Sequence, residues 1–179
     1  MELWHMRGLQ ELNLDRNRLE VLPPEIGNLT DLRTFSLEGN HLAKLPREIG
    51  QLTNLRSLKL GRNQLKSLPP ELGQLVNLQE LRLSGNQLTS LPPEIGQLSN
   101  LQNLVVEGND LTSLPSEFSR LTKLRSLQLD TNQFTVMPRA IFYLTGLLKL
   151  TLSRNRLTDL PAEIGQLSKF SCCRLKKIN

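Results

Sequence analysis

The sequence predicts an α/β solenoid, in which repeated units stack to give a parallel sheet on one side and short helical turns on the other. Three observations support this prediction. Asparagine recurs every 23 residues, from Asn17 to Asn155. Leucine makes up 42 of the 179 residues and follows the same period. Every proline lies at one place in the repeat or directly after it. A fixed period of this length is typical of an array whose neighbouring units share one core.

Seven units of 23 residues cover residues 9–169. No change of composition and no Ser/Gly-rich linker interrupts them. We therefore expect a single domain over residues 1–179, with partial repeats at 1–8 and 170–179. A single unit cannot enclose its own leucines, so burial shared between neighbours should hold the stack together.

Each unit opens on two apolar residues separated by one other residue, as in Leu81-Arg82-Leu83. This alternation is that of a short strand. The repeated asparagine follows at the turn, where the chain leaves the strand. Backbone amides need hydrogen-bond partners there, and an asparagine side chain can supply them inside a stacked core.

The second part of each unit reads Leu-Pro-(Pro)-Glu-Ile-Gly and predicts a short helical turn. Its prolines lie outside the strands, where a missing N–H does least harm. We expect the glycine to end the turn, because glycine is common just after a helix. This glycine recurs at Gly27, Gly50, Gly73, Gly96 and Gly165.

The sixth unit departs most from the others. Ala140 replaces the glutamate, and Phe142-Tyr143 replaces Gly-Gln. A fuller helical turn could present this aromatic pair outward as a second contact site. Local packing between neighbouring turns is the commoner arrangement, and we favour it.

The two ends also follow the repeat. Phe170, Cys173 and Leu175 match the frame of an eighth strand. At the start, either Trp4 and Met6 form a minimal lid over the first unit or further sequence precedes them.

The frame Leu-x-x-Leu-x-Leu-x-x-Asn-x-Leu-x-x-Leu-Pro-x-Glu-Ile-Gly-x-Leu, as in residues 78–98, resembles the 23-residue leucine-rich repeat. It is similar to the Ras-group intracellular repeat scaffolds and to bacterial repeat proteins, including spirochaetal ones and effector domains. This resemblance implies a right-handed β/α horseshoe with a parallel concave sheet and short helical or 3-10 turns on the convex side. It also implies a role in binding proteins.

Side chains between the framework leucines should point to the concave side of the sheet. Eight strands about 4.8 Å apart make a trough roughly 34 Å long. Such a trough can present on the order of 800 Å² to a partner. The alternative is a solvated face whose charges only pair across strands. The candidate contact residues on this face are Lys59, Glu80, Arg82, Val105, Glu107, Gln128 and Asp130.

Charge is distributed unevenly along the chain. Residues 147–179 carry seven basic and two acidic side chains, which accounts for the whole net charge of +5. This basic end, which includes Lys176 and Lys177, could bind an acidic protein, nucleic acid or anionic lipid. We favour a simpler role, in which it keeps the last strand from pairing with another chain.

The sequence contains no phosphate-binding glycine loop, dinucleotide fingerprint or His-Glu-x-x-His zinc motif. His5 and His41 are interpreted as ordinary surface histidines. Adjacent Cys172 and Cys173 should point to opposite faces, with Cys172 an incidental edge thiol. Base-stacking nucleic-acid binding is unexpected, because the open face has no aromatic residues. We therefore expect no cofactor, no metal and no catalysis.

The sequence thus predicts a non-catalytic protein–protein interaction module that binds a partner on its concave sheet. The alternative is a targeting domain of a larger effector or signalling enzyme. No apolar run is long enough to cross a membrane, and no secretory signal is visible. A cytoplasmic location is preferred over secretion without a classical signal. Uncapped ends would allow weak self-association.

Overall fold

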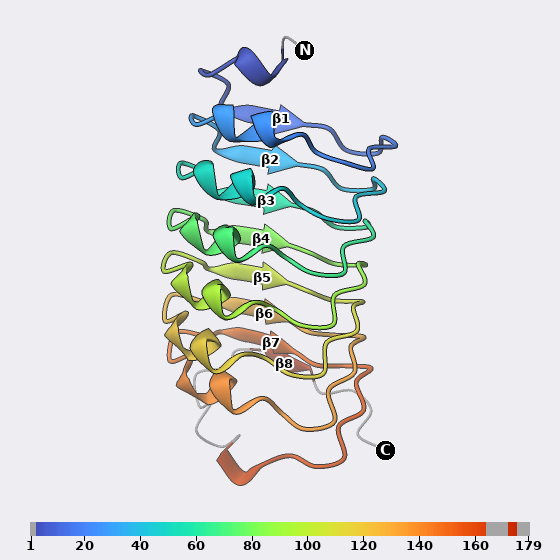
Figure 1. The fold of residues 1–179 in the computed structure, drawn as a ribbon. Helices are drawn as coiled ribbons and strands as arrows, with labels where there is room; N and C mark the ends of the chain where they lie inside the picture. The colour runs from blue at the N-terminus through green and yellow to red at the C-terminus, as the bar shows by residue number, and fades with distance from the viewer. Residues whose placement is uncertain (1–2, 164–171, 175–179) are drawn as a thin grey trace.

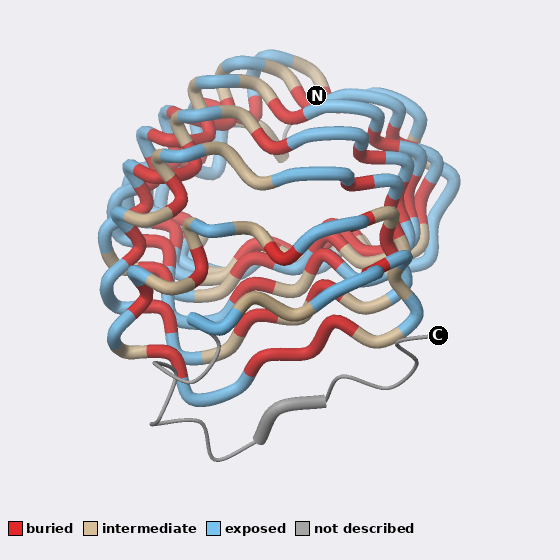
Figure 2. The backbone as a smooth tube through the Cα atoms, turned by 90° about the horizontal axis from the view of Figure 1, so that it is seen from below, coloured by how far each residue is buried: buried red, intermediate tan, exposed pale blue. Residues whose placement is uncertain are grey.

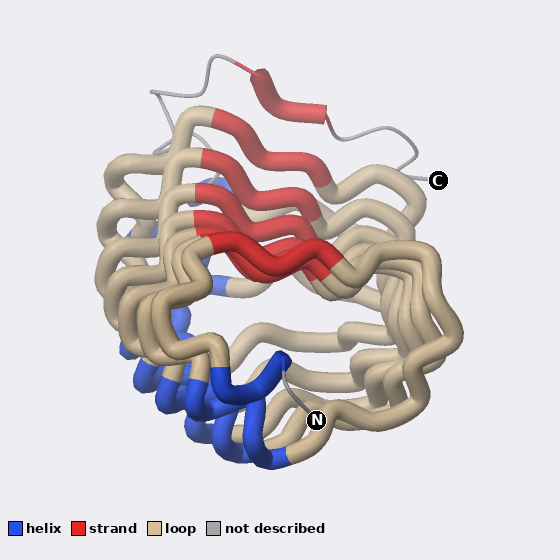
Figure 3. The backbone as a smooth tube through the Cα atoms, turned by 90° about the horizontal axis from the view of Figure 1, so that it is seen from above, coloured by secondary structure: helices blue, strands red, loops and turns tan. Residues whose placement is uncertain are grey.

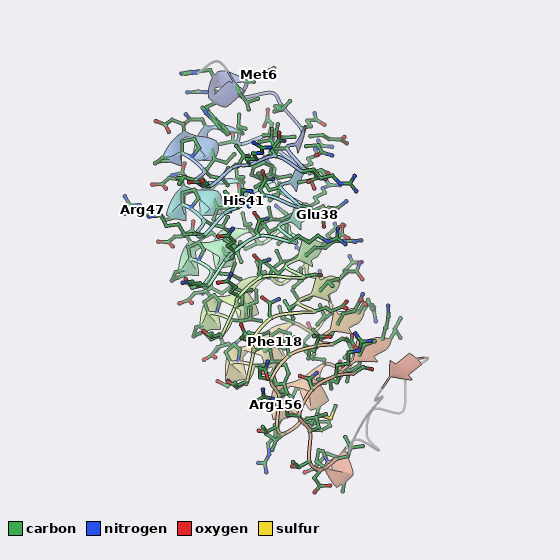
Figure 4. All side chains as sticks on the ribbon, turned by 90° about the vertical axis from the view of Figure 1, so that its right-hand side faces the viewer. Met6, Glu38, His41, Arg47, Phe118 and Arg156 are labelled. Atoms are coloured by element: carbon green, nitrogen blue, oxygen red, sulfur yellow. The ribbon has the colours of Figure 1, made fainter. Side chains whose placement is uncertain are left out.

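The structure, a computed structural model, describes residues 3–163 and 172–174. The chain winds into a stack of similar units that carries one eight-stranded parallel sheet. Strand order in the sheet is the order along the chain (Figure 1). Seen from the side, the stack bends into an arc with the strands on its inner side (Figure 4). The predicted solenoid with a concave parallel sheet is confirmed.

Each strand is three residues long and pairs in register with the strand 23 residues further on, as Leu58 does with Leu81. The framework leucines therefore stand in columns directed into the core. The strands are β1 Glu11–Asn13, β2 Thr34–Ser36, β3 Ser57–Lys59, β4 Glu80–Arg82, β5 Asn103–Val105, β6 Ser126–Gln128, β7 Lys149–Thr151 and β8 Cys172–Arg174.

The turns opposite the sheet are 3-10 helices, and from η2 onward each follows the repeated proline directly. That proline is extended, with φ near −70° as at Pro46, and its carbonyl accepts the first helical hydrogen bond, as from Ile49. The helices are η1 Leu3–His5, η2 Pro24–Asn28, η3 Arg47–Gln51, η4 Pro70–Gln74, η5 Pro93–Gln97, η6 Ser116–Arg120 and η7 Arg139–Tyr143.

The core fills the space between strands and helices along the whole stack. Figure 3 shows the strands on one side of each coil and the helices across from them. Buried residues line the inside of the coil, as Figure 2 shows. Most of the core is leucine, and Phe35, Phe118 and Phe134 fill it where the pattern changes. Fully buried leucines each contribute roughly 1.5–3 kcal/mol by burial.

The repeated asparagines join neighbouring units through hydrogen bonds. Asn86 is buried, and its Oδ1 accepts a hydrogen bond from the Leu65 amide at 3.0 Å. Its Nδ2 donates to the carbonyls of Leu60 and Leu83, each at 3.0 Å. One side chain thus satisfies backbone groups of two successive units, which confirms and extends the predicted role. The same three bonds recur at Asn40, Asn63, Asn109, Asn132 and Asn155.

The prediction that the repeated glycine ends the helical turn is wrong. Gly73 lies inside η4, and no left-handed backbone angle is found there. A Cβ at this position would lie 2.7 Å from the carbonyl oxygen of Glu94 in the next unit. Glycine is needed because the next unit passes too close for any side chain. Gly50 and Gly96 are equally close to the backbone of the next unit, whereas Gly27 lies closest to the end of the Gln51 side chain. Gly165 lies outside the described residues.

The left-handed conformation occurs instead just before the repeated asparagine. Gly85 has φ +64° there, and Arg62, the equivalent residue one unit earlier, has φ +54°. The Arg62 Cγ lies 3.7 Å from where a Cβ of Gly85 would be. The arginine stem therefore lies beside the bare backbone of the next unit.

The sixth unit does not contain a fuller helix, because η7 has the same five residues as η2 to η6. Phe142 is partly buried and packs against the core. Tyr143 is 67% exposed. The favoured local packing is therefore found for Phe142, whereas Tyr143 points to solvent.

The described residues at the two ends fit the repeat. Trp4 packs against the core, whereas Met6 is 53% exposed, so Trp4 covers the first unit and Met6 does not. β8 pairs with β7, which confirms the predicted eighth strand. The predictions for Phe170, Leu175, Lys176 and Lys177, and for the Cys172 and Cys173 side chains, lie outside the described part of the chain.

Replacing Asn86 with alanine should lower the free energy of unfolding by about 2–4 kcal/mol, because buried backbone groups lose their partner. Urea denaturation followed by circular dichroism measures this change. Asn77 is a matched control, since it is exposed and donates one hydrogen bond, to the Thr53 carbonyl. Its alanine variant should lose less than about 1 kcal/mol. Equal losses at the two positions would contradict the role given to Asn86.

Replacing Gly73 with alanine should destabilise the protein by about 1–3 kcal/mol, because the added methyl group collides with the next unit. Helix propensity alone predicts the opposite sign. Gly8 provides the control, because nothing lies within 4 Å of a Cβ placed there. Thermal unfolding of both variants tests the assignment, and a stabilised Gly73→Ala variant would refute it.

Candidate interaction surface

The strand face, defined here as the outward side chains of β3 to β6 and of the two residues after each strand, holds all seven candidate residues. Each of them is partly or fully exposed. The residues come from four successive units, and the parallel register fixes their spacing. Lys59, Glu80, Arg82, Val105 and Gln128 lie in the strands, and Glu107 and Asp130 follow β5 and β6.

Four of the candidates form one row across the sheet. Lys59 is in register with Arg82, Arg82 with Val105, and Val105 with Gln128. The row thus runs from two cations through one aliphatic side chain to an amide. Parallel pairing brings these four residues together although they are 23 residues apart in sequence.

Glu80 accepts hydrogen bonds from two neighbouring side chains. Arg82 Nε donates to Glu80 Oε1 at 2.7 Å, and Ser57 Oγ donates to Glu80 Oε2 at 2.8 Å. Partial burial raises the pKa of Glu80, but these hydrogen bonds and the charges of Arg82 and Lys59 outweigh it. The pKa of Glu80 therefore lies below its usual value, and the carboxylate stays ionised at neutral pH.

Asp130 is tied into the fold. Its carboxylate accepts hydrogen bonds from the Thr151 hydroxyl and, at 2.9 Å, from the Ser153 amide. In the first unit, Asp15 accepts the corresponding two hydrogen bonds, from the Ser36 hydroxyl and the Glu38 amide of the second unit. Both aspartates therefore link successive units through hydrogen bonds. In both cases the hydroxyl residue stands 21 positions after the aspartate.

Within residues 3–163 and 172–174, no group of three or more His, Cys, Asp or Glu side chains is placed to hold a metal ion. No helix in this part of the chain is long and apolar enough to span a membrane. His41 is exposed, follows the repeated Asn40 and lies outside the strands (Figure 4).

Replacing Arg82 with glutamine should raise the pKa of Glu80 toward its usual value, because the largest of the favourable interactions is lost. Titration of the Glu80 carboxyl carbon by NMR measures this directly, with Arg47→Gln as a control on the opposite side. In the wild type the folded pKa lies below the unfolded one. The stability that Glu80 contributes is therefore present above the unfolded pKa and lost as pH falls through the folded pKa. An unchanged titration would contradict the pairing.

Comparison with known proteins agrees with this architecture. A family model described as a leucine-rich repeat region matches residues 1–85 and 70–133. A second, described as leucine rich repeat, matches residues 122–170. None of the curated proteins compared matches the chain significantly.

Three solved structures illustrate the similarity. A Leptospira interrogans leucine-rich repeat protein is 39% identical over 96% of this chain and 55% of its own, with a TM-score of 0.60. An internalin of Listeria monocytogenes is 28% identical over 98% of this chain and 50% of its own, with a TM-score of 0.85. The ectodomain of the Arabidopsis thaliana receptor kinase GASSHO1/SCHENGEN3 is 38% identical over 96% of this chain and 22% of its own, with a TM-score of 0.82.

The chain spans between about a fifth and just over half of the length of these proteins. The Leptospira and Listeria structures confirm the resemblance to bacterial repeat proteins. Since the family models match most of the sequence and the described strands and turns follow the 23-residue period, the chain belongs to the leucine-rich repeat family.

Proposed function

We propose that this protein is a non-catalytic interaction module that binds another protein through its strand face. The observation that supports this most directly is the row Lys59–Arg82–Val105–Gln128. These side chains project from the sheet outside the leucine core, and the register of the strands holds them in place. Such a preformed surface limits the ordering cost of binding.

The chemistry of the face indicates what it can recognise. Arg82 is paired with Glu80, while Lys59 forms no ion pair among the described residues. A carboxylate of the partner could therefore pair with Lys59, and an apolar group could cover Val105. Charged groups around an apolar centre are typical of protein interfaces, in which the rim is polar.

A structural neighbour supports the same role. The GASSHO1/SCHENGEN3 ectodomain was solved in complex with CASPARIAN STRIP INTEGRITY FACTOR 2. Like this chain, that ectodomain is built of leucine-rich repeats. The likeness extends the binding role to this protein as a proposal, without indicating its partner.

A second candidate function is recognition of a target on behalf of a larger effector or signalling enzyme. The similar structures are longer than this chain, which covers between 22% and 55% of each of them. In that arrangement the strand face would hold the target, and a separate part of the protein would act on it.

Reversing both charges of the row, as Lys59→Glu with Arg82→Glu, should weaken partner binding about tenfold or more, because complementary charges become repulsive. Immobilised wild type and variant would be compared for the proteins they capture from a cell extract. Each captured protein would then be titrated by calorimetry against both forms.

The matched control is Lys44→Glu with Lys66→Glu. It makes the same change in net charge at two exposed lysines outside the strands. Circular dichroism confirms that each variant is folded. If the control weakens binding as much as the strand-face variant, or if neither has any effect, the strand face is not the binding surface.

A further inference from the structure

A groove opens on the helical side of the molecule, between η6 and η7. Its volume is about 410 Å³, within the range of sites that hold small ligands or side chains. We call it the turn-side groove. It lies across the core from the strand face, because the helices and strands occupy opposite sides of each coil (Figure 3). Its lining includes Leu114, Ser116, Ser119, Val136, Ala140 and Tyr143.

The groove coincides with the departures of the sixth unit from the repeat. Ala140 stands where the helices η2 to η6 carry glutamate, and its short side chain leaves space. Val136 and Tyr143 border that space and are 65% and 67% exposed. Among the large apolar residues of the described chain, these two are the most exposed. Apolar side chains gathered at a hollow are typical of a contact site, whereas single exposed ones are not.

The charged residue that lines the groove is basic. It is Arg139, and none of the lining residues is acidic. A second hollow, of about 470 Å³, lies on the other side of Val136 and Arg139, and there Asp159 and Glu163 contribute acidic groups. Arg139 thus lies between an apolar groove without acids and a hollow that carries two.

Arg139 forms no ion pair with the acidic side chains near it in the described structure. Neither Asp159 nor Glu163 forms an ion pair with it in the described structure, where Arg47–Glu48 and Glu80–Arg82 are the ion pairs found. Glu117, in the neighbouring η6, accepts a hydrogen bond from Ser116.

From this geometry we propose that the turn-side groove binds a peptide segment of a partner protein that carries a large apolar side chain flanked by carboxylates. The apolar side chain fills the space above Ala140, between Val136 and Tyr143. A neighbouring carboxylate pairs with Arg139, whose guanidinium suits bidentate recognition of such a group. This site is separate from the strand face and does not depend on it.

Three blocked peptides test the proposal with the whole chain. One has leucine between two aspartates, the second has leucine between two lysines, and the third has serine between two aspartates. In ¹H–¹⁵N NMR titrations, the first should shift the amide signals of Ala140 and Tyr143 in a saturable way. It should bind about tenfold more tightly than either of the others.

Two pairs of variants identify the groups responsible. Arg139→Gln should remove the preference for the aspartate peptide over the lysine peptide. Arg47→Gln, at the equivalent position of η3, should retain it; Arg47 extends from η3 on the side away from the strands (Figure 4). Val136→Ser should weaken binding of the aspartate–leucine peptide, and Val21→Ser, at the equivalent exposed position of the first unit, should not.

Three results would overturn the proposal. The first is the absence of a saturable shift at millimolar peptide. The second is equal binding of the acidic and basic peptides. The third is a shift of the Ala140 and Tyr143 signals on concentrating the protein alone, which would assign the groove to a second copy of this chain.

Discussion

The hydrogen bonds of the repeated asparagines are the constraint on which the rest of the structure depends. At each turn the chain leaves the sheet inside the molecule, where water cannot satisfy its backbone groups. Asn63 shows the solution, because its side chain bonds to the Leu42 amide and to the carbonyls of Leu37 and Leu60. The asparagine of each unit thus supplies hydrogen-bond partners for backbone groups of the preceding unit. The leucines then fill a space whose dimensions these bonds have set, and the strands fall into register.

The sequence was a good guide wherever one unit alone contains the relevant pattern. Alternation of apolar residues located the strands to within a residue, since the pattern Leu81-Arg82-Leu83 overlaps β4 at Glu80–Arg82. The 23-residue period then gave their pairing. The glycines were misjudged because their cause lies in the following unit. Nothing around Gly50 in the sequence shows that the Glu71 carbonyl passes 2.5 Å from where its Cβ would be. The left-handed turns were not predicted either. Glycine is the usual signal for this conformation, and arginine stands in its place at Arg16 and Arg154.

The candidate surface shows the same division. That Lys59, Arg82 and Val105 form a row follows from their spacing of 23 residues and from the parallel register. The hydrogen bonds of Glu80 with Ser57 and Arg82 depend on side-chain rotamers, which no repeat pattern specifies. The turn-side groove was not predicted. It depends on the short side chain of Ala140 and on the exposure of Val136 and Tyr143. Departures from a repeat indicate where to look, but their geometry depends on how the neighbouring units pack.

Throughout the described chain, each strand and each 3-10 helix contacts its counterparts in the adjacent units and none further away. Deleting or duplicating one whole unit at the level of the gene would therefore preserve every kind of contact that the protein uses. The strand face would be shortened or lengthened by one strand spacing, about 4.8 Å. Unequal recombination could thus vary the length of the strand face in fixed increments.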